Sequence, residues 1–276
     1  MLMKFTKMHG LGNDFVVVDA VTQNVRITAS MVRRLADRSR GIGCDQVLVI
    51  EPPTEPGIDF NYRIFNQDGG EVEQCGNGAR CLARYVQDRR LTGKNPVIVK
   101  TKNRVMELQL ETNKLVTVNM GVPQLDPAQI PFQADQPATL YDIDVNGQNH
   151  QIAAISMGNP HAVLQVEDID KAPVASLGPV LESHPSFPNQ VNVGFMQIID
   201  RNKIKLRVFE RGVGETQACG SGACAAAVAA IRQELVDSPV TMQLTGGDLR
   251  IQWRGDNEPL FMTGPAVSVF HGRVRI

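Results

Sequence analysis

Polar and apolar residues alternate in many short segments of the chain, which predicts a fold rich in strands. The alternation is clearest at 58–66 and 203–209, where every second side chain falls on the same face of an extended segment. Helices are predicted at 28–39, 77–90, 173–182 and 221–235. Further strands are predicted at 13–19, 46–51, 96–100, 104–110, 115–120, 151–156, 161–166, 192–199, 240–244 and 248–253.

Two of the predicted helices have the character of central, buried elements. The helix at 221–235 contains the run CAAAVAAI, which is small and apolar on every side, and a helix of that kind is buried all round. The helix at 77–90 places Leu82, Ala83 and Val86 on one face. Each helix follows a strand and a glycine-containing turn, so both halves of the chain predict a sheet with a helix packed on it.

The chain contains an internal repeat. The segments RIFNQDGGEVEQCGNGA (63–79) and RVFERGVGETQACGSGA (207–223) share eight of seventeen residues without a gap, at an offset of 144. A weaker match relates 8–13 to 156–159, in the same order and at an offset of 146. This pattern indicates an internal duplication that produced two similar halves.

The repeat and the pattern of elements together predict an α+β fold of two pseudo-symmetric domains. We expect each domain to be a curled, barrel-like β-sheet around a central helix, with the active site in the cleft between the domains. The expected domains are 1–120 and 121–264, and the proline-rich stretch 121–137 is the expected linker.

Composition limits the classes of partner. Apolar residues make up 42% and charged residues 21%, as in ordinary globular proteins, and 28 Lys and Arg against 29 Asp and Glu give a net charge of −1. That balance disfavours nucleic acid and anionic membranes as partners and favours small molecules or protein. The apolar stretch 218–231 is too short to span a membrane, and the first residues do not read as a leader. The five cysteines are an odd set, so we expect reduced thiols in a cytoplasmic protein.

Two of the cysteines, Cys75 and Cys219, precede the two central helices and are followed by Gly76-Asn77 and Gly220-Ser221. Backbone N–H groups and the positive end of the helix dipole make such a position an anion site and lower the pKa of a thiol. A carboxylate held by both helix starts would place one thiol on each face of its α-carbon. This arrangement suits a two-base inversion, in which one thiol removes the α-proton and the other returns a proton to the opposite face.

Other interpretations of these residues are open at this stage. Cys44, Cys81 and Cys224 are expected in the core, because cysteine is often buried. A zinc site built from Cys75, Cys81, Cys219 and Cys224 lacks the Cys-x-x-Cys pairs typical of zinc, so no metal is expected. The glycine-rich loops could instead hold a phosphate, and residues 159–161 could form a plain turn. None of the lysines lies in the repeated segments, which disfavours a pyridoxal cofactor there.

Taken together, several segments resemble the diaminopimelate epimerase family over essentially the whole chain. The resemblance implies an isomerase that uses no cofactor and interconverts LL- and meso-diaminopimelate for lysine and peptidoglycan precursor biosynthesis. The segments are KMHGLGNDF (7–15), GCDQ (43–46), QCGNGARC (74–81), MGNPH (157–161), FERGVGETQACGSGAC (209–224) and MTGPA (262–266).

The resemblance also assigns roles to residues. Cys75 and Cys219 are the expected acid–base pair, with Cys219 as the proton acceptor and Cys75 as the donor from LL to meso. His161 and Glu210 are expected to tune the pKa values of the thiols. Arg211 suits the distal carboxylate of the substrate. The residues expected to bind substrate are Asn13, Gln46, Asn66, Gly76, Asn77, Asn159, Asn192, Glu210, Arg211, Gly220 and Ser221.

The family's arrangement further implies that the last residues, 265–276, return to the first domain, and that the protein is a homodimer. Phe270 stands where close relatives carry tyrosine, at a position linked to the dimer contact. Two other functions compete with this one. A proline-type racemase uses the same pair of thiols, but its substrate has no use for Arg211 and Glu210. A non-catalytic anion-binding module would tolerate the loss of both thiols.

Overall fold

The chain divides into two units that repeat one pattern of strand pairing. The computed structural model describes residues 2–72 and 75–275. Glu73 and Gln74 of the first repeated segment, and Ile276 at the end of the expected tail, lie outside the described residues. Unit 1 comprises Met1–Asn119 and Thr263–Ile276, and unit 2 comprises Met120–Met262.

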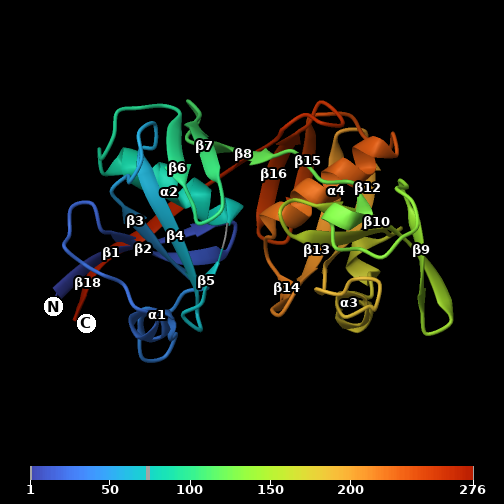
Figure 1. Ribbon diagram of the computed structural model, residues 1–276, viewed down its shortest axis with the longest axis horizontal. Helices are drawn as coiled ribbons and strands as arrows, with labels where there is room; N and C mark the ends of the chain where they lie inside the picture. The colour runs from blue at the N-terminus through green and yellow to red at the C-terminus, as the bar shows by residue number, and fades with distance from the viewer. Residues whose placement is uncertain (1, 73–74, 276) are drawn as a thin grey trace. The chain divides into compact units, whose positions relative to one another are not determined.

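In unit 1, antiparallel hairpins alternate with parallel crossovers (Figure 1). Strand β1 pairs with both β18 and β2 in antiparallel fashion, β2 is parallel to β3, and β3 is antiparallel to β4. Strand β4 is then parallel to β6, which begins the antiparallel run β6, β7, β8. The elements are β1 (Leu2–Gly10), β2 (Asn13–Asp19), α1 (Ala29–Ala36), β3 (Gln46–Glu51), β4 (Phe60–Asn66), β5 (Glu71–Val72), α2 (Gly76–Asp88), β6 (Val97–Lys100), β7 (Val105–Leu110), β8 (Val116–Gly121) and β18 (Val267–Arg275).

Unit 2 repeats this pairing. Strand β10 is antiparallel to β9 and β11, β11 is parallel to β12, β12 is antiparallel to β13, β13 is parallel to β15, and β15 is antiparallel to β16. The elements are η1 (Pro127–Gln129), β9 (Tyr141–Val145), β10 (Gln148–Ser156), β11 (Pro160–Gln165), η2 (Ile169–Lys171), α3 (Val174–Glu182), β12 (Asn192–Asp200), β13 (Lys203–Glu210), β14 (Gly214–Thr216), α4 (Gly220–Arg232), β15 (Val240–Leu244), β16 (Gly247–Gln252) and β17 (Leu260–Gly264).

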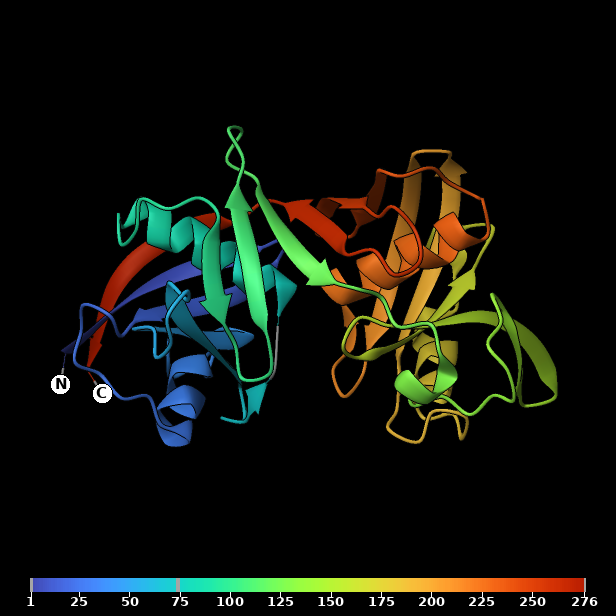
Figure 2. The same cartoon turned by 45° about the horizontal axis from the view of Figure 1, so that its top comes forward.

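Each sheet curls around one central helix, as Figure 2 shows for α2 in unit 1 and for α4, in orange, in unit 2. Helix α2 packs against β1, β2, β3, β7 and β18, and α4 packs against β10 to β13, β15 and β16. Ten of the thirteen residues of α4 are buried, and all but Val228 among them are glycine, alanine or cysteine. The small side chains let strands approach the helix from several directions. This architecture confirms the α+β class and the central helix predicted for each half.

A second helix packs on the same sheets in each unit. In unit 1, Thr28 caps α1 by accepting a hydrogen bond from the Met31 amide, and Val32 and Leu35 of α1 are buried with apolar residues of β1 to β4. In unit 2, α3 packs against β12 and β13 through Val174 and Leu181. The sheets are therefore covered by apolar helix faces that the periodicity of the sequence had indicated.

All four predicted helices are present, with ends within three residues of the expected bounds, and every predicted strand is present. The longer strands β1, β9, β17 and β18, and the short β5 and β14, had no counterpart in the prediction. The reason is clearest for β18, whose first five residues are all exposed, so no alternation of buried and exposed positions marks it as a strand. None of the described helices has the length and apolar character needed to cross a lipid bilayer.

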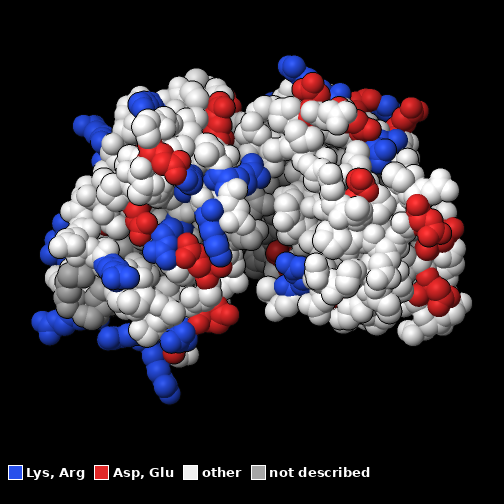
Figure 3. Space-filling model, viewed as in Figure 1, with Lys and Arg blue, Asp and Glu red and all other residues white. Residues whose placement is uncertain are grey.

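Charge is divided unevenly between the units. Unit 1 carries 19 Lys and Arg against 13 Asp and Glu, and unit 2 carries 9 against 16. On the face drawn in Figure 3, the basic side chains of unit 1 are interspersed with acidic ones. Several basic side chains of unit 1 form ion pairs, such as Arg63 with Glu71 and Lys94 with Asp59.

The contact between α3 and β13 gives a test of the packing. A Cβ atom at Gly178 would lie 2.8 Å from Cγ of Phe209 and 2.9 Å from its Cβ, which is too close for either group to stay in place. Alanine would gain about 1 kcal/mol of helix propensity, but overpacking costs about 1–3 kcal/mol. We expect Gly178→Ala to lower the free energy of unfolding, measured by urea denaturation and circular dichroism. Gly93→Ala is the control, because nothing lies within 4 Å of that position, and equal stability of the two variants would contradict the packing argument.

Candidate active site

The candidate site of unit 1 is built at the start of α2. Cys75 is the N-cap residue of this helix, and its Sγ accepts a hydrogen bond from the amide of Gly78 at 3.4 Å. The expected carboxylate-binding residues Gly76 and Asn77 are the first two residues of the helix. The thiol therefore lies where the helix dipole is positive and stabilises negative charge.

Asn13 reaches the thiol from the tight turn between β1 and β2. Leu11 and Gly12, the two turn residues, both have positive φ, as a two-residue hairpin requires. The Oδ1 atom of Asn13 lies 3.8 Å from Sγ of Cys75 and accepts a hydrogen bond from Nδ2 of Asn77 at 3.2 Å. The structure thus brings together Asn13, Cys75 and Asn77.

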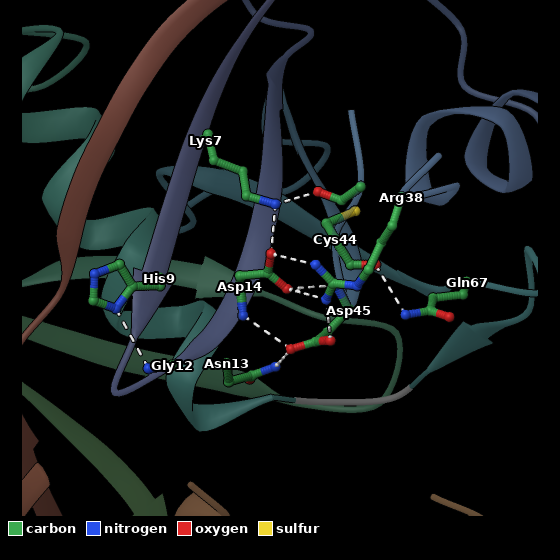
Figure 4. Close-up of polar contacts among 10 residues, drawn as sticks. Lys7, His9, Gly12, Asn13, Asp14, Arg38, Cys44, Asp45 and Gln67 are labelled. Carbon is green, nitrogen blue, oxygen red and sulfur yellow. Dashed lines mark hydrogen bonds and ion pairs between the residues drawn. The ribbon is translucent and has the colours of Figure 1, made fainter. Parts of the chain in front are cut away.

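A network of charged residues holds Asn13 in this orientation (Figure 4). Nδ2 of Asn13 donates to Oδ2 of Asp45 at 3.0 Å, which turns Oδ1 toward the thiol. Arg38 donates at 2.8 Å to both Asp45 and Asp14, and Lys7 pairs with Asp14 at 2.5 Å. The Asn13 amide is therefore oriented by an ion-paired carboxylate.

The same network keeps Asp14 ionised. Burial opposes ionisation, but hydrogen bonds from Arg38 and Lys7 outweigh it and lower the pKa of Asp14 to about 2. Sequence analysis gave no role to Asp45, although it lies in the GCDQ segment (43–46). A backbone amide hydrogen bond joins Asp14 to Asp45 in each direction, and this pairing was not visible before the strands were placed.

Gln46 and Asn66 lie opposite each other on β3 and β4. Nε2 of Gln46 donates to Oδ1 of Asn66 at 2.9 Å. Gln46 begins β3 and Asn66 ends β4, so both lie at one edge of the sheet of unit 1, the edge to which Asn13 at the start of β2 also belongs. Three of the residues predicted for substrate in this unit, Asn13, Gln46 and Asn66, therefore lie at one sheet edge.

The candidate site of unit 2 is built at the start of α4. Cys219 is the N-cap residue of α4 and is buried. Its Sγ lies 3.7 Å from Oγ of Ser221, which accepts a hydrogen bond from Nδ2 of Asn159 at 3.3 Å. Oδ1 of Asn159 in turn lies 3.2 Å from Nε2 of His161. Cys219, Ser221, Asn159 and His161 thus form one connected group.

Burial decides the charge of both titratable groups in this cluster. His161 is fully buried, and burial together with the nearby charge of Arg211 lowers its pKa to about 3, so the ring is neutral at pH 7. Burial, followed by the carboxylate of Glu210, raises the pKa of Cys219 well above its ordinary value. Before substrate binds, Cys219 is therefore a thiol, and His161 is a neutral ring.

Glu210 and Arg211 follow directly at the end of β13. Glu210 accepts a short hydrogen bond from Oγ1 of Thr216. The backbone amide of Arg211 donates to Oδ1 of Asn192 at 3.0 Å, and its Nη1 donates to the Asn189 carbonyl at 2.8 Å. Asn192 also donates to the Pro160 carbonyl at 3.0 Å, so it links the turn before His161 to the strand end that carries Arg211.

The two clusters, one in each unit, correspond position by position. In the parallel pair β2–β3, Phe15 faces Gln46, and in β11–β12, His161 faces Asn192, both at an offset of 146. Asn66 ends β4 and Glu210 ends β13, at an offset of 144, as for Cys75 and Cys219. The duplication therefore places equivalent residues at equivalent points, and the halves differ in the side chains they carry there.

The other cysteines have core positions. Cys44, Cys81 and Cys224 are buried, and burial raises the pKa of Cys44 and of Cys81 to about 12. Within residues 2–72 and 75–275, no group of three or more His, Cys, Asp or Glu side chains is placed to hold a metal ion.

Comparison with known proteins relates the whole chain to one family. The family model described as diaminopimelate epimerase matches residues 5–125 and 153–269. Proteins named diaminopimelate epimerase from Ectopseudomonas mendocina and from Pseudomonas aeruginosa are each 58% identical to the chain over 276 residues, which is the full length of both partners.

The chain belongs to the diaminopimelate epimerase family. Solved structures with the same fold include a phenazine biosynthesis protein of the PhzF family from Bacillus anthracis, with a TM-score of 0.74, 17% identity and complete coverage of both chains. A hydroxyproline epimerase from Agrobacterium vitis has a TM-score of 0.71 and 14% identity, and the match covers 99% of this chain and 92% of the other. At such low identities these structures support the fold alone.

The electrostatics of Cys219 give a test of the site in this family member. Replacing Glu210 by glutamine removes the negative charge that helps to raise the pKa of Cys219. We expect Glu210→Gln to lower the midpoint of thiolate formation, read from ultraviolet thiolate absorbance against pH with Cys219→Ser as the baseline. Glu167→Gln, which removes an exposed charge of the same unit, is the control and is expected to leave the midpoint in place. An unchanged midpoint in Glu210→Gln would show that burial alone sets it.

Proposed function

We propose that this protein interconverts LL- and meso-diaminopimelate by inverting one α-carbon, without a cofactor. The observation that carries the proposal is the pair of equivalent cysteines, each at the start of a central helix, in a chain 58% identical along its full length to named epimerases. The enzyme is an isomerase, and its product serves lysine and peptidoglycan precursor biosynthesis. Its chemistry needs reduced cysteines, which the cytoplasm maintains, so we place it there.

The proposed reaction uses the two thiols in opposite protonation states. One thiolate removes the α-proton and becomes a thiol, and the electrons of the broken C–H bond move into the carboxylate, which becomes enediolate-like. The other thiol then protonates the α-carbon on the opposite face and becomes a thiolate. We assign Cys219 as acceptor and Cys75 as donor from LL to meso. Because Cys219 holds its proton before substrate binds, the proton must first leave, and the Glu210 carboxylate is the neighbouring acceptor.

The reacting carboxylate is held by backbone N–H groups of the helix starts, Gly76-Asn77 in α2 and Gly220-Ser221 in α4. Donors at a helix start are fixed before the reaction begins, so they stabilise the developing enediolate without reorganising. Neutral His161 is a hydrogen-bonding partner of Asn159. In our proposal His161 tunes the pKa of the Cys219 thiol through this hydrogen bond.

The distal amino-acid end is bound by charged and amide side chains. The guanidinium of Arg211 has five N–H donors, one of which is directed to the Asn189 carbonyl, and suits the distal carboxylate. Glu210 suits the distal ammonium group as well as tuning the thiol. The amide side chains complete the substrate-binding set, which is Asn13, Gln46, Asn66, Asn159 and Asn192. A proline-type substrate lacks this distal end, so Arg211 and Glu210 favour diaminopimelate.

Substitution of either thiol tests the mechanism. We expect Cys75→Ser and Cys219→Ser each to lower turnover by at least about 10²-fold, because each removes a general acid or base. Proton NMR in D₂O with metal-free, pyridoxal-free protein measures loss of the α-proton signal of LL-diaminopimelate and appearance of the meso product. Cys224→Ser makes the same change at a buried cysteine of α4 and is expected to retain activity.

The same NMR experiment separates the competing functions. If the α-proton of L-proline exchanges with solvent and that of diaminopimelate does not, the two-thiol chemistry stands and the substrate is a proline-type amino acid. No exchange on either substrate, from folded and reduced protein, would favour an anion-binding module. Near-normal turnover in both Cys75→Ser and Cys219→Ser would refute the two-thiol mechanism.

We further propose that the enzyme is a homodimer that associates through the region of Phe270. Strand β18 exposes Val267, Val269 and Phe270, whose exposed fractions are 43%, 55% and 48%. The Phe270 ring meets Phe5 of the neighbouring strand edge-on, at 5.9 Å between ring centroids. An apolar strip on an exposed strand is a surface that a second copy can cover, and the ring does not need the hydroxyl of the tyrosine found in relatives to bury area.

The dimer proposal predicts the effect of a charge on this strip. We expect Phe270→Asp to shift the protein to a monomer in analytical ultracentrifugation, because burying an unpaired carboxylate in an interface is costly. Val213→Asp places the same charge at another exposed apolar residue, which is 76% exposed in unit 2, and is expected to leave the mass unchanged. A wild-type protein that is monomeric at all concentrations would rule out the dimer.

A further inference from the structure

A buried tyrosine hydroxyl lies beside the first thiol and has no role in the mechanism above. Tyr62 lies on β4 and is 1% exposed. Its hydroxyl has no hydrogen-bond partner among the residues that the structure describes. A buried polar group without a partner costs about 1–3 kcal/mol, so a hydroxyl retained in such a place calls for a functional explanation.

The hydroxyl is directed at the first turn of α2. A Cβ atom at Gly78 would lie 2.2 Å from the Tyr62 oxygen, so the glycine is what allows the ring to fit. The amide of the same Gly78 donates to Sγ of Cys75 at 3.4 Å. Tyr62 and the Cys75 thiol are thus neighbours of one residue at the helix start.

Charge at the thiol acts on this hydroxyl. Burial first, and then the charges of Cys75 and Cys81, raise the pKa of Tyr62 well above its ordinary value. Tyr62 therefore stays protonated at neutral pH and keeps its O–H as a donor. A neutral donor beside a thiol favours the thiolate over the thiol.

The second half of the duplicated fold carries no such group. Tyr62 faces Ile50 across β3–β4, and Leu206 faces Met196 across β12–β13, so Leu206 is the structural counterpart of Tyr62. Leu206 is buried and apolar. The thiol of that half instead has the Glu210 carboxylate beside it, which disfavours its thiolate. The group beside the thiol thus favours the thiolate in the first half, where it is Tyr62, and disfavours it in the second half, where it is Glu210.

We propose that Tyr62 is a positioning residue of the epimerase, whose hydroxyl donates a hydrogen bond to Sγ of Cys75 when that sulfur is a thiolate. Together with Glu210, it sets the two thiols in different protonation states before substrate binds, with the thiolate on Cys75 and the proton on Cys219. This state acts directly on meso-diaminopimelate; for the LL substrate Cys75 must first take a proton from solvent, and Cys219 must pass its proton to Glu210. The proposal rests on the proposed function for the roles of the two thiols. The hydrogen bond itself is independent of the substrate.

Three other groups lie at or near the start of α2 and stay in place when the hydroxyl is removed. Cys81 of α2 is a thiol, because burial raises its pKa to about 12. Arg80 of α2 is a fully buried cation whose Nε donates to the Pro265 carbonyl at 3.1 Å. Asn13 contributes an uncharged amide oxygen 3.8 Å from the sulfur. A change in the titration of Cys75 on removing the Tyr62 hydroxyl is therefore assigned to that hydroxyl.

Alkylation of Cys75 against pH tests the proposal without using substrate. The initial rate of modification by iodoacetamide, located by peptide mass spectrometry, follows the thiolate fraction of Cys75. We expect the midpoint in Tyr62→Phe to rise by about one pH unit, which is a tenfold smaller thiolate fraction below the midpoint. Tyr85→Phe removes another buried tyrosine hydroxyl, on α2 itself, and is expected to leave the midpoint unchanged.

An unchanged midpoint in Tyr62→Phe would overturn the proposal, and so would an equal rise in Tyr85→Phe. If Tyr62→Phe does not fold, as judged by circular dichroism, Tyr62→Leu replaces it, because leucine already occupies the equivalent site of the second half. The limb of the kcat/KM profile that reports Cys75 should shift with the alkylation midpoint while KM stays constant. Absence of diaminopimelate turnover in the wild type would refute the proposed function and leave the alkylation result intact.

Discussion

The position of each thiol depends on the burial of a helix inside a curled sheet. A helix start can hold a thiol and an anion site only where the helix is fixed along its length, and burial of α2 and α4 provides this. The cost is a restriction on side chains, most severe in α4, where glycine and alanine predominate because several strands approach it closely. The hairpin and strand ends that carry the amide side chains are positioned by the same sheets. Packing in the core therefore sets the geometry of the chemistry at the edge.

Duplication supplied two copies of this arrangement, and substitution made them unequal. The two copies share the order of strand pairing, the glycine-rich helix start and the cysteine at the N-cap. The differences are side chains at equivalent positions, with Phe15 against His161 and Asn66 against Glu210. An inversion needs one base and one acid at a given moment, and two identical half-sites would give no preference for either assignment. Because the two thiols have different neighbouring side chains, one of them is favoured as the base and the other as the acid.

Much of the fold could be predicted from the sequence, because buried side chains recur at a regular spacing along a helix or a strand. The all-apolar run of α4 and the alternation in β4 and β13 gave elements close to their observed bounds. Strand β18 was not predicted, since an exposed strand has no buried face to mark it. For the candidate site, the motifs predicted Cys75, Cys219 and Asn13, but they did not point to Asp45 or Tyr62, whose contacts appear only once the strands are placed. The sequence predicted that a helix start lowers the pKa of its thiol, and for Cys219 this prediction is wrong, because burial and the Glu210 carboxylate raise that pKa once the chain is folded.

The charges of the two half-sites show why a neutral residue suits one thiol and an acidic residue suits the other. A carboxylate beside a buried thiol keeps the proton on sulfur, and it can also accept that proton when the thiol has to act as a base. In our proposal the neutral hydroxyl of Tyr62 favours the Cys75 thiolate without adding a charge, so the sulfur keeps the basicity it needs to remove a proton from carbon. Opposite biases on the two sulfurs, from a neutral donor on one and a carboxylate on the other, fit a reaction that runs in both directions, which an epimerase requires.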